Sequence, residues 1–145
     1  MQDDSNTTEP MIQRRGVVAV VLREQRFLAI CRSAAVVAPG KYCFPGGGIE
    51  GEESEPAALE REVQEELGVV IRPLRCIWRS TTPWGITLAW WLGEIDEEAN
   101  LVPNPLEVES IHWLSREELL ARADLLDSNR HFFDACAKGH FELGL

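Results

Sequence analysis

The sequence predicts an α/β fold in which a mixed β-sheet carries helices on its faces. Short runs rich in β-branched and aromatic residues recur along the chain, and a capped amphipathic helix interrupts them. Further helical segments follow the last of these runs. No repeat or linker is seen, so we expect residues 13–145 to form one domain. The polar, acidic residues 1–12 are expected to be disordered.

The first β-rich runs are residues 16–22 and 26–32, with only three residues between them. Such close spacing predicts a β-hairpin. Residues 33–48 contain two prolines and several glycines, which favour a loop with one brief strand at residues 42–44.

A helix is predicted to follow this loop. Ser54 is a favourable N-cap residue, and Gly68 suits the position just after the last helical turn. Apolar residues recur between them at helical spacing, namely Ala57, Ala58, Leu59, Val63 and Leu67.

The remaining elements alternate less regularly. Residues 69–81 and 86–95 are predicted to be two strands joined by a turn, and residues 108–114 a further strand. A helix over residues 116–123 and a last one over residues 128–138 complete the expected fold.

Composition excludes some classes of function. The formal net charge is −10, which disfavours a long nucleic acid as partner, because such binding needs clustered Lys and Arg. No apolar run reaches membrane-spanning length, and the first residues lack the pattern of a signal peptide. We therefore expect a cytoplasmic protein without a membrane partner. Four dispersed cysteines are expected to be buried, reduced thiols, namely Cys31, Cys43, Cys76 and Cys136.

Three glutamates share one face of the predicted helix. Glu62, Glu65 and Glu66 stand at positions i, i+3 and i+4. Carboxylates at this spacing could bind a hard cation such as Mg²⁺ or Mn²⁺, but a solvated acidic surface would have the same pattern.

The wider pattern distinguishes these interpretations. From Gly47 to Val69 the chain reads G-x5-E-x7-R-E-U-x-E-E-x-G-U, where U is aliphatic. This stretch resembles the signature of the Nudix hydrolases at every defining position. The resemblance implies an α/β/α sandwich and metal-dependent hydrolysis of a nucleoside diphosphate linked to another moiety. Mg²⁺ or Mn²⁺ is the implied cofactor.

The resemblance also implies roles for single residues. The three helix glutamates and the backbone carbonyl of Gly46 would bind the metal. Arg61 and Glu53 would pair and hold the loop against the helix. The general base would be Glu62 or Glu65, and the resemblance does not decide between them.

Further site residues lie outside this stretch. A later carboxylate, Glu107 or its rival Glu109, would complete the metal site shortly before Trp113. Arg32 would contact a phosphate, since a guanidinium can bind one with two hydrogen bonds.

The substrate is less well determined. The short chain resembles the MutT-like nucleoside triphosphate pyrophosphatases, and Asn129 would read the purine edge as in that subgroup. Phe44 and Trp84 are candidates for base stacking, with Trp90 nearby. Pro83 instead favours an ADP-ribose or ADP-sugar pyrophosphatase, and a non-catalytic nucleotide-binding domain is a further alternative. A monomer or homodimer is expected.

Overall fold

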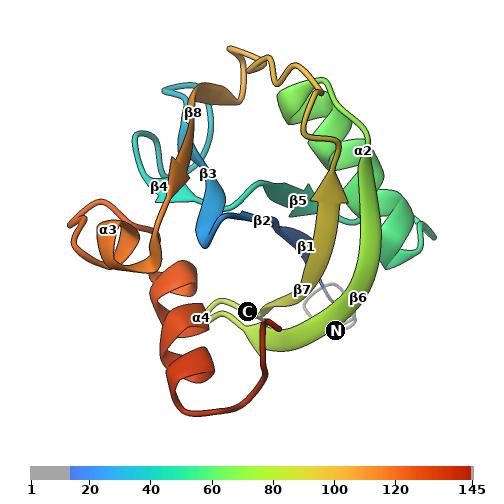
Figure 1. Cartoon of the computed structure of the whole chain (residues 1–145). Coiled ribbons are helices and arrows are strands. Elements are labelled where there is room, and N and C mark those ends of the chain that lie inside the picture. Colours follow the sequence, from blue (N-terminus) through green and yellow to red (C-terminus); the bar gives the residue numbers. More distant parts are fainter. Residues whose placement is uncertain (1–13, 145) are drawn as a thin grey trace.

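The computed structural model describes residues 14–144 and consists of two β-sheets with helices on two sides (Figure 1). The expected disorder of residues 1–12 falls outside the described residues. The strands are β1 (Arg14–Val20), β2 (Leu22–Arg23), β3 (Arg26–Arg32), β4 (Tyr42–Cys43), β5 (Gly46–Gly48), β6 (Ile71–Thr81), β7 (Ile86–Ile95) and β8 (Val108–Leu114). The helices are α2 (Glu55–Leu67), α3 (Arg116–Leu120) and α4 (Asp127–Ala137).

One sheet is mixed and the other is antiparallel. The mixed sheet has the order β5-β1-β7-β6, and only its β1–β7 pair is parallel. In the second sheet β3 pairs with β2, β4 and β8, always antiparallel. The predicted α/β class with a mixed sheet is confirmed, although the strands divide between two sheets.

The predicted hairpin of residues 16–22 with residues 26–32 is wrong for most of its length. Only Leu22 and Arg23 pair with β3, around a two-residue turn whose φ angles are positive. The preceding strand instead runs parallel to β7 over seven positions. Strand β1 is apolar on both faces. Such a strand is suited to the interior of a sheet, where both faces are buried, and β1 lies there between β5 and β7.

Alternate residues of β1 face two separate hydrophobic cores. Val17 and Ala19 pack in the core beneath α2, whereas Val20 packs in the core beneath α4. The first core is aliphatic and takes Leu59 and Val63 from α2. The second is rich in aromatic residues, chiefly Phe27, Phe44, Trp90, Phe132 and Phe133. A helix therefore covers each side of the strands, as expected for an α/β/α sandwich.

Helix α2 begins and ends as predicted. The Ser54 side chain accepts a hydrogen bond from the Ala57 amide, and Gly68 is left-handed with φ 68°.

The other predicted bounds need correction. Residues 46–48 form strand β5 rather than loop, β6 begins at Ile71, α3 ends at Leu120, and α4 spans Asp127–Ala137. Strand β5 was missed because three glycines carry no strand signal of their own.

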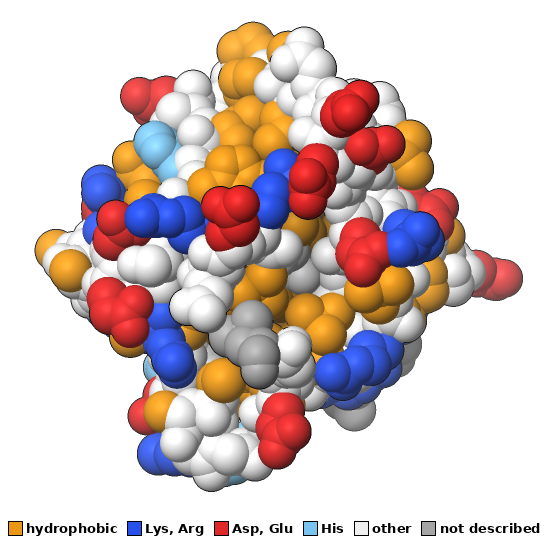
Figure 2. Space-filling model, in the orientation of Figure 1, with side chains coloured by type: hydrophobic (Ala, Val, Ile, Leu, Met, Phe, Trp, Pro, Cys, Tyr) orange, Lys and Arg blue, Asp and Glu red, His pale blue; other side chains and the backbone are white. Residues whose placement is uncertain are grey.

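The surface carries charges of both signs. On the face shown in Figure 2, acidic and basic side chains are interspersed with apolar ones.

All four cysteines are free thiols, but only Cys31 and Cys43 are buried, so the prediction of burial is wrong for Cys76 and Cys136. Among the described helices, none combines the length and apolar character needed to cross a membrane.

Candidate active site

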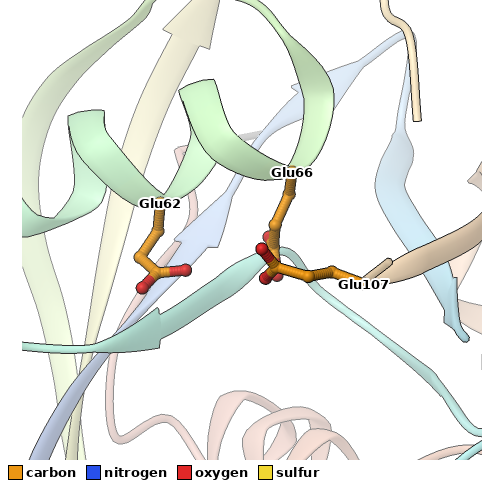
Figure 3. A group of neighbouring side chains, drawn as sticks. All are labelled: Glu62, Glu66 and Glu107. Atoms are coloured by element: carbon orange, nitrogen blue, oxygen red, sulfur yellow. The ribbon is translucent and has the colours of Figure 1, made fainter. Parts of the chain in front are cut away.

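The acidic face of α2 meets a carboxylate from a distant part of the chain. Glu62 and Glu66 are 8% and 5% exposed on the inner face of the helix. Glu107, just before β8, reaches the same place (Figure 3). Each of the three side chains offers an oxygen within 4.8 Å of the others. Carboxylates of one charge are rarely buried together without a compensating group.

Burial changes the acidity of two of these carboxyls. Loss of hydration raises the pKa of Glu66 to about 8, and the charges of Glu62 and Glu107 add to the shift. Burial likewise raises the pKa of Glu62 to about 7, opposed by the hydrogen bond from Arg61. Both groups are therefore poised to lose a proton near neutral pH when a cation offsets the repulsion.

The glycines of β5 let the backbone approach these carboxylates closely. The Gly46 amide donates a hydrogen bond of 3.0 Å to Glu66 Oε1. A Cβ atom on Gly47 would lie 2.3 Å from the carboxyl carbon of Glu62. No side chain can occupy that position without displacing the carboxylate.

Arg61 ties the helix to β5 and to the loop between them. Its Nε lies 2.7 Å from Glu53 Oε2, and its Nη2 donates to the Gly48 carbonyl at 2.8 Å. Nη1 lies 3.0 Å from Glu62 Oε2 and 3.3 Å from Glu65 Oε1. The structure therefore brings Arg61 and Glu53 together, and the same guanidinium also orients Glu62.

The donor set fits a hard divalent cation. All three clustered side chains offer carboxylate oxygens, the ligands that Mg²⁺ and Mn²⁺ prefer. Glu65 lies outside this cluster, with its side chain 46% exposed and paired with Arg61. Of the two later carboxylates, Glu107 joins the cluster and Glu109 is exposed.

A cavity of about 300 Å³ opens beside β5. Residues of β1, β5, β7 and the start of α4 line it, and among its described lining residues there are three arginines and no Asp or Glu. Asn129 lines it while only 2% exposed, and its Nδ2 has no hydrogen-bond partner in the described part of the chain. A buried amide without a partner is costly unless a ligand completes its bonds.

Comparison with known proteins identifies the family. The sequence pattern of the NUDIX domain matches residues 12–136. The chain belongs to the Nudix hydrolase family.

Two curated relatives are similar to this Nudix domain over part of their length. NAD-capped RNA hydrolase NudC from Deinococcus radiodurans is 31% identical over 99 residues, which cover 67% of this chain and 35% of that protein. Nucleoside triphosphatase NudI from Salmonella agona is 33% identical over 75 residues, covering 50% of each chain. The chain thus spans about a third to a half of these relatives.

A solved structure has the same fold. The MutT protein from Methanosarcina mazei Go1 superposes with a TM-score of 0.75 at 23% identity, covering 90% of this chain and 96% of that one. At this identity the likeness shows the fold alone.

The predicted substrate contacts of the Nudix domain are only partly brought together. Arg32 and Asn129 both line the cavity, as does Phe44, although the ring of Phe44 is buried against Phe27. Trp84 is 68% exposed in the β6–β7 turn and does not line the cavity. Trp90 is fully buried in the aromatic core, so it is unavailable for stacking on a base.

Sequence reasoning missed one residue that positions the carboxylate cluster. The Asn104 side chain donates a hydrogen bond from Nδ2 to the backbone carbonyl of Glu65, and the Asn104 backbone N–H donates one to the backbone carbonyl of Glu66. The backbone carbonyl of Asn104 accepts a hydrogen bond from the backbone N–H of Glu107. The Asn-Pro pair at residues 104–105 is a turn signal, and it could have marked this loop.

Proposed function

We propose that this Nudix hydrolase converts nucleoside triphosphates to nucleoside monophosphates and pyrophosphate, as a MutT-like enzyme of nucleotide-pool housekeeping. One observation carries the proposal. Three clustered carboxylates lie beside a cavity that contains arginines and a buried amide without a partner. This combination suits a substrate with both phosphates and a hydrogen-bonding base.

The cluster would hold Mg²⁺ or Mn²⁺ through Glu62, Glu66 and Glu107. The family resemblance adds Glu65 and the carbonyl of Gly46 to this set. When bound, the cation supplies charge neutralisation for the diphosphate and Lewis acidity at phosphorus.

The protein's own groups bind the substrate and accept a proton. Arg32 would contact a phosphate, and its Nε is already fixed by a 2.7 Å hydrogen bond to the Val37 carbonyl. The amide of Asn129 can donate to a purine edge and accept from it.

Hydrolysis needs a proton acceptor near the attacking water. As the water oxygen bonds to phosphorus, the bridging P–O bond breaks, pyrophosphate leaves, and the water proton passes to a carboxylate. Glu62 and Glu65 are the two candidates. Glu62 has a pKa of about 7, which suits a general base near neutral pH. Glu65 is the more accessible of the two.

The relatives support different substrates. NudI is named a nucleoside triphosphatase, which agrees with the proposal, whereas NudC is named for NAD-capped RNA. Pro83, which suggested an ADP-sugar substrate, is exposed in the β6–β7 turn.

A substrate panel with purified protein and Mg²⁺ tests the proposal. It contains normal and oxidised nucleoside triphosphates, ADP-ribose, NADH and diadenosine polyphosphates, with phosphate and pyrophosphate release followed separately. We expect monophosphate and pyrophosphate from a purine triphosphate. Release of AMP from ADP-ribose, with no hydrolysis of triphosphates, would instead indicate an ADP-sugar pyrophosphatase. Tight nucleotide binding without turnover would contradict an enzymatic role.

Variants make the panel specific. Glu66→Gln removes a clustered carboxylate and should lower kcat/KM by at least about 100-fold. Glu60→Gln is the matched control, because Glu60 is exposed on the same helix and outside the cluster. Equal activity of both variants would contradict a role for the cluster in hydrolysis.

A further inference from the structure

The first residues of β1 form one end of the cavity. Because strand side chains alternate, Arg14, Gly16 and Val18 share one face, and they line the cavity together with Arg15 and Val17 of the other face. Their partners on β7 include Ile86 and Leu88, which line it as well. Strand β1 therefore provides a continuous wall from one end of the cavity to the other.

The Leu88 side chain covers the middle of this wall, where β1 has a glycine. A Cβ atom on Gly16 would lie 3.0 Å from Leu88 Cδ2 and 3.2 Å from the Gly47 carbonyl oxygen. Gly46–Gly48 of β5, which carry no side chains, line the cavity beside it. The middle of the cavity wall is therefore uncharged, because glycine backbone and the Leu88 side chain form it.

Positive charge is placed at both ends of this wall. At the carboxylate end, Arg32 lies beside Cys43, and Val18 pairs with Gly46 next to Glu66. Arg14 is four residues away along β1, a distance of about 13 Å at ~3.3 Å per residue. A chain with net charge −10 thus has arginines at opposite ends of one cavity.

A nucleotide has three ends that a protein can recognise: its base, its 5′-phosphates and the 2′,3′ side of its sugar. In the function proposed above, on which this inference rests, Asn129 takes the base and Arg32 the phosphates. The third end remains for Arg14. We propose that Arg14 binds a phosphate on the 2′ or 3′ oxygen, so the preferred substrates are nucleotides phosphorylated on both sides of the sugar.

Arginine suits this role because its planar guanidinium binds phosphate with two parallel hydrogen bonds. Two sources share this chemistry: a free nucleotide with a second phosphate, and the 5′ end of an oligonucleotide, whose next phosphodiester occupies the same place.

Binding titrations test the inference without requiring turnover. The probes are a purine nucleoside 5′-monophosphate, its 3′,5′- and 2′,5′-bisphosphates and a 5′-phosphorylated trinucleotide, each with Mg²⁺. We expect the native protein to bind at least one bisphosphate at least about tenfold more tightly than the monophosphate. Arg14→Gln should abolish this preference and leave monophosphate affinity within about twofold. Arg14→Lys, which keeps the charge, should restore part of it.

Arg75→Gln is the matched control, because Arg75 is exposed on β6 of the same sheet and does not line the cavity. Tighter binding of the trinucleotide than of either bisphosphate would assign the site to an oligonucleotide end, and the reverse to a free nucleotide. Equal affinity of the native protein for monophosphate and bisphosphates would overturn the inference. Equal weakening of every probe by Arg14→Gln would do the same.

The two proposals fail separately. If triphosphates are hydrolysed but no bisphosphate is preferred, the inference about Arg14 is wrong and the proposed function stands. If the preference is present but the substrate panel shows no turnover, the protein has the second phosphate site without the proposed activity.

Discussion

At the residue scale, the burial of Glu66 makes the stability of the metal-free protein depend on pH. Its pKa is about 8 in the folded protein and about 4.5 in an unfolded chain. Between these values the folded state holds the proton more tightly, so the contribution of Glu66 to stability is greatest below pH 4.5 and falls as pH rises toward 8. We expect Glu66→Gln to remove much of this decline. Urea unfolding of both proteins in EDTA at pH 5, 7 and 9 measures it.

The Glu60→Gln variant is again the control, since its exposed carboxylate should leave the decline unchanged. A Glu66→Gln protein whose stability falls with pH as steeply as that of the native chain would contradict the buried carboxylate as its source.

Gly47 and Gly48 offer a second comparison between single residues. A methyl group at Gly47 would collide with the Glu62 carboxylate, whereas one at Gly48 would meet only the Arg15 carbonyl oxygen, 4.0 Å away. Gly47→Ala should therefore lower kcat/KM by at least about tenfold, while Gly48→Ala should stay within about twofold. Steady-state kinetics on the best panel substrate, with circular dichroism to verify folding, decides the matter.

At the element scale, Arg61 joins α2 to β5. Lys at this position keeps the charge but cannot reproduce the hydrogen bonds to the Gly48 carbonyl and to Glu62. We expect Arg61→Lys to lower the free energy of unfolding by roughly 1–3 kcal/mol at pH 7. Arg79→Lys on β6 should cost less than about 1 kcal/mol, because that pair with Glu55 is more exposed. Urea titrations of both variants give the comparison.

The pair of Arg61 with Glu53 is expected to stabilise the protein less at low pH. The hydrogen bonds from Arg61 lower the pKa of Glu53 to about 2, so the stabilisation is present above pH 4.5 and is lost as pH falls toward 2. The difference between native and Arg61→Lys proteins should shrink over that range. A constant difference would show that Glu53 contributes nothing.

Elements differ in how much the sequence alone reveals. Helix α2 was predictable because its cap, apolar face and glutamates are all local signals between Ser54 and Gly68. Strand β1 was not, because its main partner is β7, some seventy residues away, and a continuous apolar run does not specify which strand lies beside it. The candidate site divides in the same way. The helix glutamates follow from spacing, whereas choosing Glu107 over Glu109 requires the loop geometry that Asn104 fixes.

At the scale of the whole molecule, metal binding and folding are expected to be coupled. A cation bound to the deprotonated cluster of the folded chain would have no equivalent site in the unfolded chain. Mg²⁺ should therefore raise the melting temperature more at pH 8.5 than at pH 6. At a concentration 100 times Kd the expected stabilisation is about 2.7 kcal/mol. Differential scanning fluorimetry across a Mg²⁺ series at both pH values measures it.

A Glu107→Gln variant provides the contrast, since it removes the one clustered carboxylate that does not belong to α2. Its response to Mg²⁺ should be weaker at both pH values. An unchanged response would place the cation elsewhere.

The wall formed by Gly16, Leu88 and β5 separates the carboxylate cluster from the far end of the cavity. The carboxylate cluster depends on α2 and the Asn104 loop, while the far end of the cavity depends on Arg14 and the β7 residue Ile86. Substitutions at that far end can therefore change which molecule is accepted while the hydrolytic machinery stays intact. Libraries that vary only Arg14 and Ile86 are the natural starting point for redirecting this enzyme to new nucleotides.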